Sequence, residues 1–199
     1  MDAGNADARP SGGDEVTDEQ QASQTQASQT SDRKEPRPKE TRAQDAQAAV
    51  HSFETHGSAE TIAAGREIAK LLVPPRLIIL RGELGAGKTT LVKGIAEALD
   101  AADPEEVTSP TFTLIHEYEG TRQVDGASQP LFLYHLDLYR IDAERQLDAL
   151  GLDELIAPDS IVLVEWGEKF PSVVKRSNGE IVIESSPGDC RKITLSLKG

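Results

Sequence analysis

Residues 82–90 read GELGAGKTT, a glycine-rich stretch of the kind that holds a phosphate group. Gly82 to Thr89 matches the pattern G-x-x-x-x-G-K-[ST] at every position. Glycines let the backbone curl until several N–H groups point at one anion, and the positive end of a following helix adds to the attraction. In such a loop Lys88 would reach the β- and γ-phosphates, and the Thr89 hydroxyl would hold Mg²⁺. The stretch therefore predicts a nucleotide phosphate site.

Chemistry on a phosphate held with Mg²⁺ needs a further carboxylate near the loop, and two predicted strand ends supply candidates. Asp137 follows the apolar run 131–136, and Glu165 follows the apolar run 161–164. Ligands of open α/β sheets bind where the strands end, so either side chain can lie beside the loop. Which of the two contacts the metal stays open. His135 could act as an acid or base, or simply be a packed or hydrogen-bonded side chain.

The loop alone does not say which reaction uses the phosphate. A GTPase normally carries an N-K-x-D sequence that reads guanine, and its absence here favours ATP. A small-molecule or nucleotide kinase usually closes an Arg-rich lid over the phosphates, but the candidate lid, residues 119–130, contains only Arg122. An ATP hydrolase is therefore our first hypothesis and a kinase the second. A third is a nucleotide-gated binding module in which hydrolysis is incidental.

Strands and helices must alternate around the loop to position these groups. Strands are expected at 50–55, 77–80, 112–118, 131–137, 161–165, 180–184 and 192–197. Helices are expected from an N-cap at Ser58 through Leu72, over 88–99 and over 143–150, with a loop or hairpin connection at 119–130. This order predicts an α/β fold, a three-layer P-loop NTPase sandwich with a largely parallel central sheet and antiparallel additions.

The N-terminal part of the chain differs in composition from the rest. Residues 1–49 lack Leu, Ile, Phe, Tyr and Trp and repeat QASQT in tandem at 21–30. Such a segment buries too little apolar surface to offset its chain entropy, so we expect a disordered acidic and polar tail. Residues 50–199 are then expected to form one P-loop ATPase domain.

Charge and hydropathy limit the surroundings in which the chain can act. The formal net charge of −13 disfavours a direct grip on nucleic-acid phosphates. No apolar run approaches the roughly 18 residues of a membrane helix, and no secretory signal stands near the N-terminus. The single Cys190 excludes an internal disulfide. We therefore expect a cytoplasmic protein that does not bind a membrane.

Three further stretches accompany the loop: TSPTFT at 108–113, HLDLYR at 135–140 and EWGEK at 165–169. In this order and at these spacings they make residues 50–199 resemble the TsaE (YjeE) family. The resemblance implies an ATPase needed for the threonylcarbamoyl modification of adenosine 37 (t6A) in tRNA. It also implies that the protein binds the paired TsaB and TsaD proteins and that ATP hydrolysis drives their repeated turnover. The tRNA would be contacted only through that complex, and the protein alone would be a monomer or associate weakly.

The resemblance further implies roles for individual residues. Lys88, Asp137 and Glu165 would be catalytic, with Thr89, Glu165 and Asp137 at or near Mg²⁺. The phosphates of ATP would be cradled by the continuous run Gly85, Ala86, Gly87, Lys88, Thr89 and Thr90.

Two segments outside the loop are also assigned by the resemblance. Residues 108–113, which include Thr111, would act as a switch that senses the γ-phosphate, and Ser58–Thr61 would lie near the adenine. The family often has Pro after Glu-Trp, where this chain has Gly167, and this loosens the backbone after the carboxylate. Trp166 itself is either a core aromatic or a contact residue for a protein partner.

Overall fold

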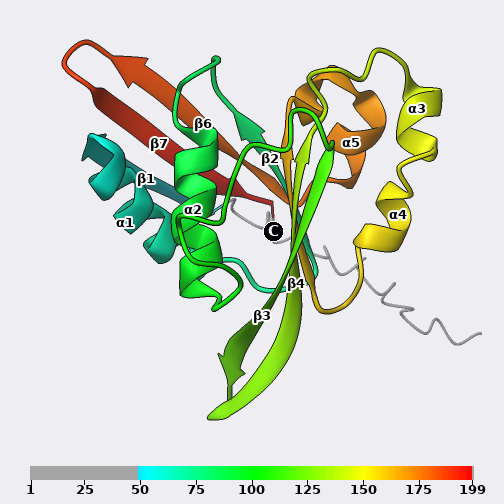
Figure 1. Cartoon of the computed structure of the whole chain (residues 1–199), viewed down its shortest axis with the longest axis horizontal. Coiled ribbons are helices and arrows are strands. Elements are labelled where there is room, and N and C mark those ends of the chain that lie inside the picture. The colour runs from blue at the N-terminus through cyan, green and yellow to red at the C-terminus, as the bar shows by residue number, and fades with distance from the viewer. Residues whose placement is uncertain (1–48, 199) are drawn as a thin grey trace, which may run out of the picture. The chain divides into compact units, whose positions relative to one another are not determined.

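The computed structural model describes residues 49–198, so the tail predicted for residues 1–49 falls, except for Ala49, outside the described residues. Seven strands form one sheet in the order β1-β7-β6-β2-β5-β4-β3 (Figure 1). Their bounds are β1 (Ala49–His56), β2 (Arg76–Arg81), β3 (Ile115–Val124), β4 (Ala127–Asp137), β5 (Ser160–Glu165), β6 (Gly179–Ser186) and β7 (Cys190–Leu197). The four central strands β6, β2, β5 and β4 run parallel, and β1, β7 and β3 are antiparallel additions. The predicted sheet is confirmed.

Helices cover the sheet from two sides (Figure 1). Helices α1 (Ser58–Ala69) and α2 (Lys88–Ala98) lie on one face, whereas α3 (Glu144–Asp148), α4 (Leu152–Leu155), the 3-10 helix η1 (Gly167–Lys169) and α5 (Pro171–Arg176) lie on the other. The apolar run of β2 serves both layers, because Ile78 and Leu80 pack toward α1 and α2 while Leu77 and Ile79 pack on the opposite side. The predicted three-layer sandwich is therefore confirmed. Among the described residues, no helix is long and apolar enough to cross a membrane.

Helices α1 and α2 approach each other closely because two glycines face across the contact. A Cβ atom on Gly94 would lie 1.9 Å from the carbonyl oxygen of Ile62, and one on Gly65 would lie 2.4 Å from that of Leu91. Neither position can therefore take a side chain without moving a helix. This contact fixes α2, whose first residue is Lys88 of the glycine-rich loop.

The start and end of α1 differ from the prediction. The N-cap residue is Gly57, at φ 93°, and the exposed Ser58 already belongs to the helix. No side-chain cap bond forms; instead the Glu60 carboxylate accepts a hydrogen bond from the His56 backbone N–H at 2.8 Å. A positive φ suits glycine better than serine, which explains the shift by one residue. The helix ends at Ala69, before the predicted Leu72.

The segment predicted as a loop or hairpin connection at 119–130 is a hairpin, and most of its residues belong to strands. β3 begins at Ile115, later than the predicted 112, and pairs with β4 along its whole length. Only Asp125 and Gly126 form the turn, at φ 51° and 80°, as a two-residue hairpin of the Asp-Gly type requires. This hairpin lies at the edge of the sheet and projects beyond the other strands (Figure 1). Its strands can therefore contain many polar residues, and such residues do not give the apolar pattern from which a strand is predicted. The candidate lid is thus a regular hairpin.

The remaining helices are shorter than the sequence suggested. The predicted helix at 143–150 is α3, which ends at Asp148, and α4 follows after Gly151, which takes φ 65°. Helix α5 was not predicted; it begins with Pro171 and buries Val173 in the second core, the apolar cluster on the sheet face opposite α1 and α2. It follows η1, so the segment after Glu165 folds back over the sheet.

Candidate nucleotide-binding site

The glycine-rich loop joins β2 to α2, as the sequence predicts. Gly85 and Gly87 take φ values of 80° and 108°, and Gly87 is the N-cap of α2. The first N–H groups of a helix have no partner inside it, so they are available to an anion at this end. Arg191, on β7, donates from Nε to the Ala86 carbonyl oxygen at 3.0 Å. A Cβ on Gly87 would lie 3.2 Å from the same nitrogen, so the Arg191 side chain packs closely against the loop and stabilises it.

Lys88 and Glu165 form a buried ion pair beside the loop. Lys88 is 6% exposed and Glu165 is 4% exposed, and Lys88 Nζ lies 3.6 Å from Glu165 Oε2. The ammonium also donates to the carbonyl oxygens of Gly82 at 2.9 Å and Glu83 at 3.1 Å. These contacts compensate two charges that would otherwise be costly to bury. They hold the lysine side chain between the loop carbonyl groups and Glu165.

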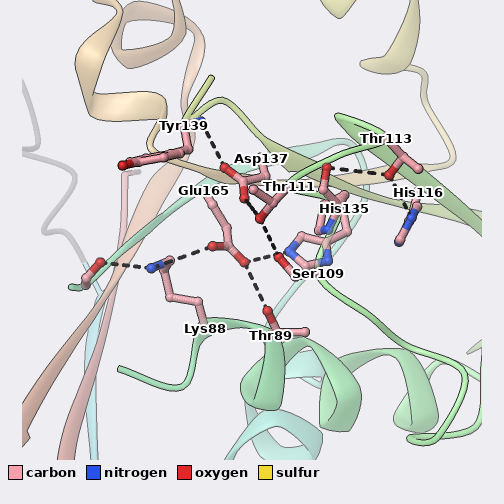
Figure 2. A network of polar contacts seen from close by, with 12 residues as sticks. Lys88, Thr89, Ser109, Thr111, Thr113, His116, His135, Asp137, Tyr139 and Glu165 are labelled. Atoms are coloured by element: carbon pink, nitrogen blue, oxygen red, sulfur yellow. Dashed lines mark hydrogen bonds and ion pairs between the residues drawn. The ribbon is translucent and has the colours of Figure 1, made fainter. Parts of the chain in front are cut away.

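Asp137 and Glu165 are direct neighbours in the parallel pairing of β4 with β5. Side chains alternate along each strand, so Asp137 lies on the same face as Leu133, and Glu165 on the same face as Leu163. That face is the one covered by α2. The two carboxylates, 3% and 4% exposed, therefore lie together beside the loop (Figure 2).

The two carboxylates have different partners. Thr89 Oγ1 lies 3.5 Å from Glu165 Oε1, so Glu165 is tied to the glycine-rich loop. Asp137 instead accepts hydrogen bonds from the Thr111 hydroxyl and, at 2.9 Å, from the Tyr139 backbone N–H. Asp137 is therefore tied to the segment 108–113, in which Thr111 also contacts the Ser109 hydroxyl at 2.8 Å (Figure 2).

A second set of contacts holds the far end of the segment 108–113. Thr113 Oγ1 lies 2.8 Å from His116 Nε2, and Tyr118 OH lies 3.3 Å from His116 Nδ1. Burial raises the pKa of Tyr118, so this group stays a hydroxyl that can donate to the imidazole. The segment is thus attached to β3 at one end and to Asp137 in its middle.

A cavity of about 470 Å³ opens at this point. It is lined by six residues of the loop 82–90, by Ser109 and Thr111, by Asp137 and Glu165, and by Tyr139 and Trp166. Of the predicted phosphate-cradling residues Gly85, Gly87, Lys88, Thr89 and Thr90 line it, whereas Ala86 is buried beneath. Ser58 does not line the cavity; it lies exposed at the start of α1. The structure thus brings together every predicted catalytic and metal-binding residue.

The oxygen atoms at this place suit Mg²⁺. Within residues 49–198, no group of three or more His, Cys, Asp and Glu side chains is placed to hold a metal alone. Mg²⁺ commonly takes only one or two protein carboxylates and completes its shell with phosphate oxygens and water. The Thr89 hydroxyl and the Glu165 carboxylate face each other, and Asp137 stands on the next strand. These residues fit a magnesium ion that is shared with a nucleotide.

Two residues that support the site were not identified from the sequence. Arg191 lies about a hundred residues beyond the loop, and no local pattern connects the two. Lys169 belongs to the EWGEK stretch but had no assigned role. Its ammonium donates to the carbonyl oxygens of Tyr139 at 2.9 Å and Ile141 at 2.8 Å, which fastens the chain after Asp137 to η1.

Three large apolar side chains are exposed at this place: Leu84 and Tyr139 line the cavity, and Phe112 follows the lining residue Thr111. Leu84 is 91% exposed, Phe112 83% and Tyr139 56%. The guanidinium of Arg140 stacks 4.3 Å above the Phe112 ring, and the Tyr139 ring lies 5.3 Å from that of Trp166. Trp166 is partly buried against the second core and also lines the cavity, at a left-handed φ of 61°.

The chain is similar in sequence to known proteins of one family. The sequence model of the family "Threonylcarbamoyl adenosine biosynthesis protein TsaE" matches residues 55–193. The chain is 38% identical over 147 residues to the tRNA threonylcarbamoyladenosine biosynthesis protein TsaE of Bacillus subtilis, covering 74% of this chain and 85% of that protein. It is 32% identical over 142 residues to the same protein of Treponema pallidum, with 71% and 97% covered.

A solved structure is also similar. The crystal structure of Bacillus subtilis YdiB superimposes with a TM-score of 0.53 and 32% identity, covering 76% of this chain and 88% of that one. The family match extends from β1 to β7 and includes the loop, both carboxylates and Arg191. The chain therefore belongs to the TsaE family of threonylcarbamoyl adenosine biosynthesis proteins.

Proposed function

We propose that this protein is a Mg²⁺-dependent ATP hydrolase that supports t6A formation by binding the TsaB–TsaD complex and driving its turnover. One observation carries the proposal. A glycine-rich loop with Lys88 and Thr89, and two strand-end carboxylates, meet in one cavity of a chain from the TsaE family. These are the parts that phosphoryl transfer from ATP to water requires.

In this proposal the loop residues 85–90 bind the phosphates, and Lys88 neutralises charge on the β- and γ-phosphates. Thr89 and Glu165 hold Mg²⁺, which when bound neutralises the phosphate oxygens. Asp137 then orients the attacking water. Thr111 contacts Asp137, and the segment 108–113 responds through this contact to the presence of a γ-phosphate. Ser58–Thr61 are the proposed neighbours of the adenine, which would lie outside the cavity already described.

The hairpin at β3–β4 supports hydrolysis over transfer to a metabolite. The segment that would serve as a kinase lid is paired residue by residue with β4, from Ile115 to Val124. An arginine-rich segment that closes over the phosphates is what a small-molecule kinase would need. We therefore keep the kinase only as an outcome of the test.

The exposed rim of the cavity supports a protein partner. Leu84, Phe112 and Tyr139 are large apolar side chains that are exposed to solvent, and such groups are typical of protein-binding surfaces. The net charge of −13 makes direct binding of tRNA unfavourable. We therefore propose TsaB and TsaD as partners, tRNA contact only through them, a monomer or weak self-association when alone, and action in the cytoplasm.

The proposal is tested by the release of free phosphate from labelled ATP by the purified full chain. We expect slow Mg²⁺-dependent release alone and faster release with TsaB and TsaD. Glu165→Gln should abolish the release, whereas Glu184→Gln, at an exposed position of β6, should not. Label found on an added metabolite would support the kinase instead.

The same proteins test the link to tRNA. We expect repeated rounds of t6A formation by TsaB and TsaD to require both the chain and ATP. If turnover is equal with and without ATP, the ATPase role is wrong. If Glu165→Gln binds ATP without hydrolysis and still supports full turnover, the chain is a nucleotide-gated binding module.

A further inference from the structure

We propose that His135 is a positioning residue that holds the Glu165 carboxylate in place through a hydrogen bond from Nε2. The inference rests on the proposed function, because it concerns the side chain that would contact Mg²⁺. His135 does not line the cavity and would touch neither nucleotide nor metal. It would act through Glu165 alone.

The geometry places His135 directly against the carboxylate. Nε2 lies 2.9 Å from Glu165 Oε1, and the histidine is fully buried. Figure 2 shows the carboxylate between Lys88 on one side and His135 on the other. Lys88 approaches Oε2 while His135 approaches Oε1, so the two contacts together define the orientation of the carboxylate plane.

The surroundings also define the position of the hydrogen on the imidazole. A carboxylate accepts hydrogen bonds, so Nε2 carries the hydrogen. Within residues 49–198, Nδ1 is buried with no hydrogen-bond partner. A hydrogen there would be an unpaired buried donor and would add a charge, whereas a bare Nδ1 leaves only an unpaired acceptor. The hydrogen bond from Nε2 to Glu165 therefore fits this place.

Packing alone does not explain a histidine here. One face of β4 carries every second side chain of the strand, namely Leu131, Leu133, His135 and Asp137. The two leucines belong to the apolar core between the sheet and helices α1 and α2. A third apolar residue would fill the position without leaving Nδ1 unpaired. Buried polar groups with missing partners are rare and call for a specific reason. The contact with Glu165 supplies that reason.

Loss of this contact has a definite consequence. Glu165 would remain paired with Lys88 at 3.6 Å, and its Oε1 atom would keep only the longer contact of 3.5 Å from the Thr89 hydroxyl. The carboxylate could then turn toward the ammonium, which removes it from Thr89 and engages the lysine needed for the phosphates. Binding of nucleotide with Mg²⁺ should therefore suffer more than binding of nucleotide alone.

Two polar variants and one apolar variant separate positioning from packing. His135→Gln can place its side-chain N–H near the position of Nε2, whereas His135→Asn is too short to do so. His135→Phe keeps the ring volume and has no donor. Binding of ADP is measured by calorimetry with Mg²⁺ and with a chelator, and binding of Mn²⁺ to the ADP complex is measured by electron paramagnetic resonance.

We expect His135→Phe and His135→Asn to weaken Mg²⁺-dependent binding about ten- to a hundredfold, as loss of support behind a metal ligand does. Binding in chelator should change less than about threefold, and His135→Gln should stay close to the unmodified protein in both conditions. Equal losses with and without Mg²⁺, or Mg²⁺-dependent binding unchanged in both Phe and Asn variants, would overturn the inference. If His135→Phe does not fold, the Gln and Asn variants decide.

Failure of the inference is distinguishable from failure of the proposed function. If the unmodified chain binds ADP without any dependence on Mg²⁺ and releases no phosphate from ATP, the proposed function is wrong. If the unmodified chain shows both properties and the Asn variant shares them fully, only the role of His135 is wrong.

Discussion

Asp137 and Glu165 are paired neighbours on β4 and β5, yet each is hydrogen-bonded to a different segment of the proposed site. Glu165 contacts Thr89 of the glycine-rich loop, and Asp137 contacts Thr111 of the segment 108–113. A one-residue offset between the two strands would turn one side chain to the opposite face. The register therefore places one carboxylate beside the glycine-rich loop and the other beside the segment 108–113.

This separation predicts different defects for the two carboxylates. Glu165→Gln should lose Mg²⁺-dependent nucleotide binding, because it removes the charge beside Thr89. Asp137→Asn should keep that binding but slow hydrolysis about a hundredfold, the scale of a lost base or water-orienting group. Calorimetry with Mg²⁺ and phosphate release check the two properties. The opposite pattern would exchange the roles of the two residues.

Lys88→Ala should weaken ATP binding about ten- to a hundredfold, because each hydrogen bond to a charged group contributes about 1.5–3 kcal/mol. It should also lower the melting temperature, since Glu165 would lose its buried cation. Calorimetry and thermal unfolding measure the two effects. Lys175→Ala removes an exposed lysine from α5 and should change neither. Unchanged ATP binding in Lys88→Ala would refute the assignment of the loop.

The exposed rim predicts a defect in partner binding. Phe112 is 83% exposed and projects from the segment that contacts Asp137. Phe112→Ala should weaken binding of the TsaB–TsaD pair about tenfold, as truncation of an aromatic contact residue commonly does. A pull-down in ATP, in ADP and without nucleotide measures this. Val174→Ala, an exposed apolar site on α5, is the matched control, and equal retention of both variants would place the interface elsewhere.

Gly94→Ala should destabilise the whole domain. The added Cβ would meet the Ile62 carbonyl at 1.9 Å, so α1 and α2 must separate. Overpacking of this kind costs about 1–3 kcal/mol, more than the roughly 1 kcal/mol that alanine adds to helix propensity. Chemical denaturation measures the free energy of unfolding. Ala63→Gly, at an exposed position of α1, should cost only the propensity difference; a stable Gly94→Ala would show that the helices can move apart.

Much of the fold could be predicted from local patterns. The apolar runs before Asp137 and Glu165 and the run 77–80 identify three central strands, because a strand buried on both faces is apolar throughout. The same reasoning predicted strands at 112–118 and 131–137 with a loop or hairpin connection between them, but it did not show that β3 and β4 extend through most of 119–130. Its residues are polar because they pair at the edge of the sheet, and only the Asp125-Gly126 turn marks it locally.

The sequence by itself determined the glycine-rich loop between strand and helix, the strand-end carboxylates and the family, since each depends on residues close together or in a fixed order. It did not determine which groups touch. The N-cap at Gly57, the brace from Arg191 to Ala86 and the contact of His135 with Glu165 join residues through backbone geometry or sheet register. Only the tertiary structure decided these, because the strand order and pairing bring distant side chains to the same face and fix their distances.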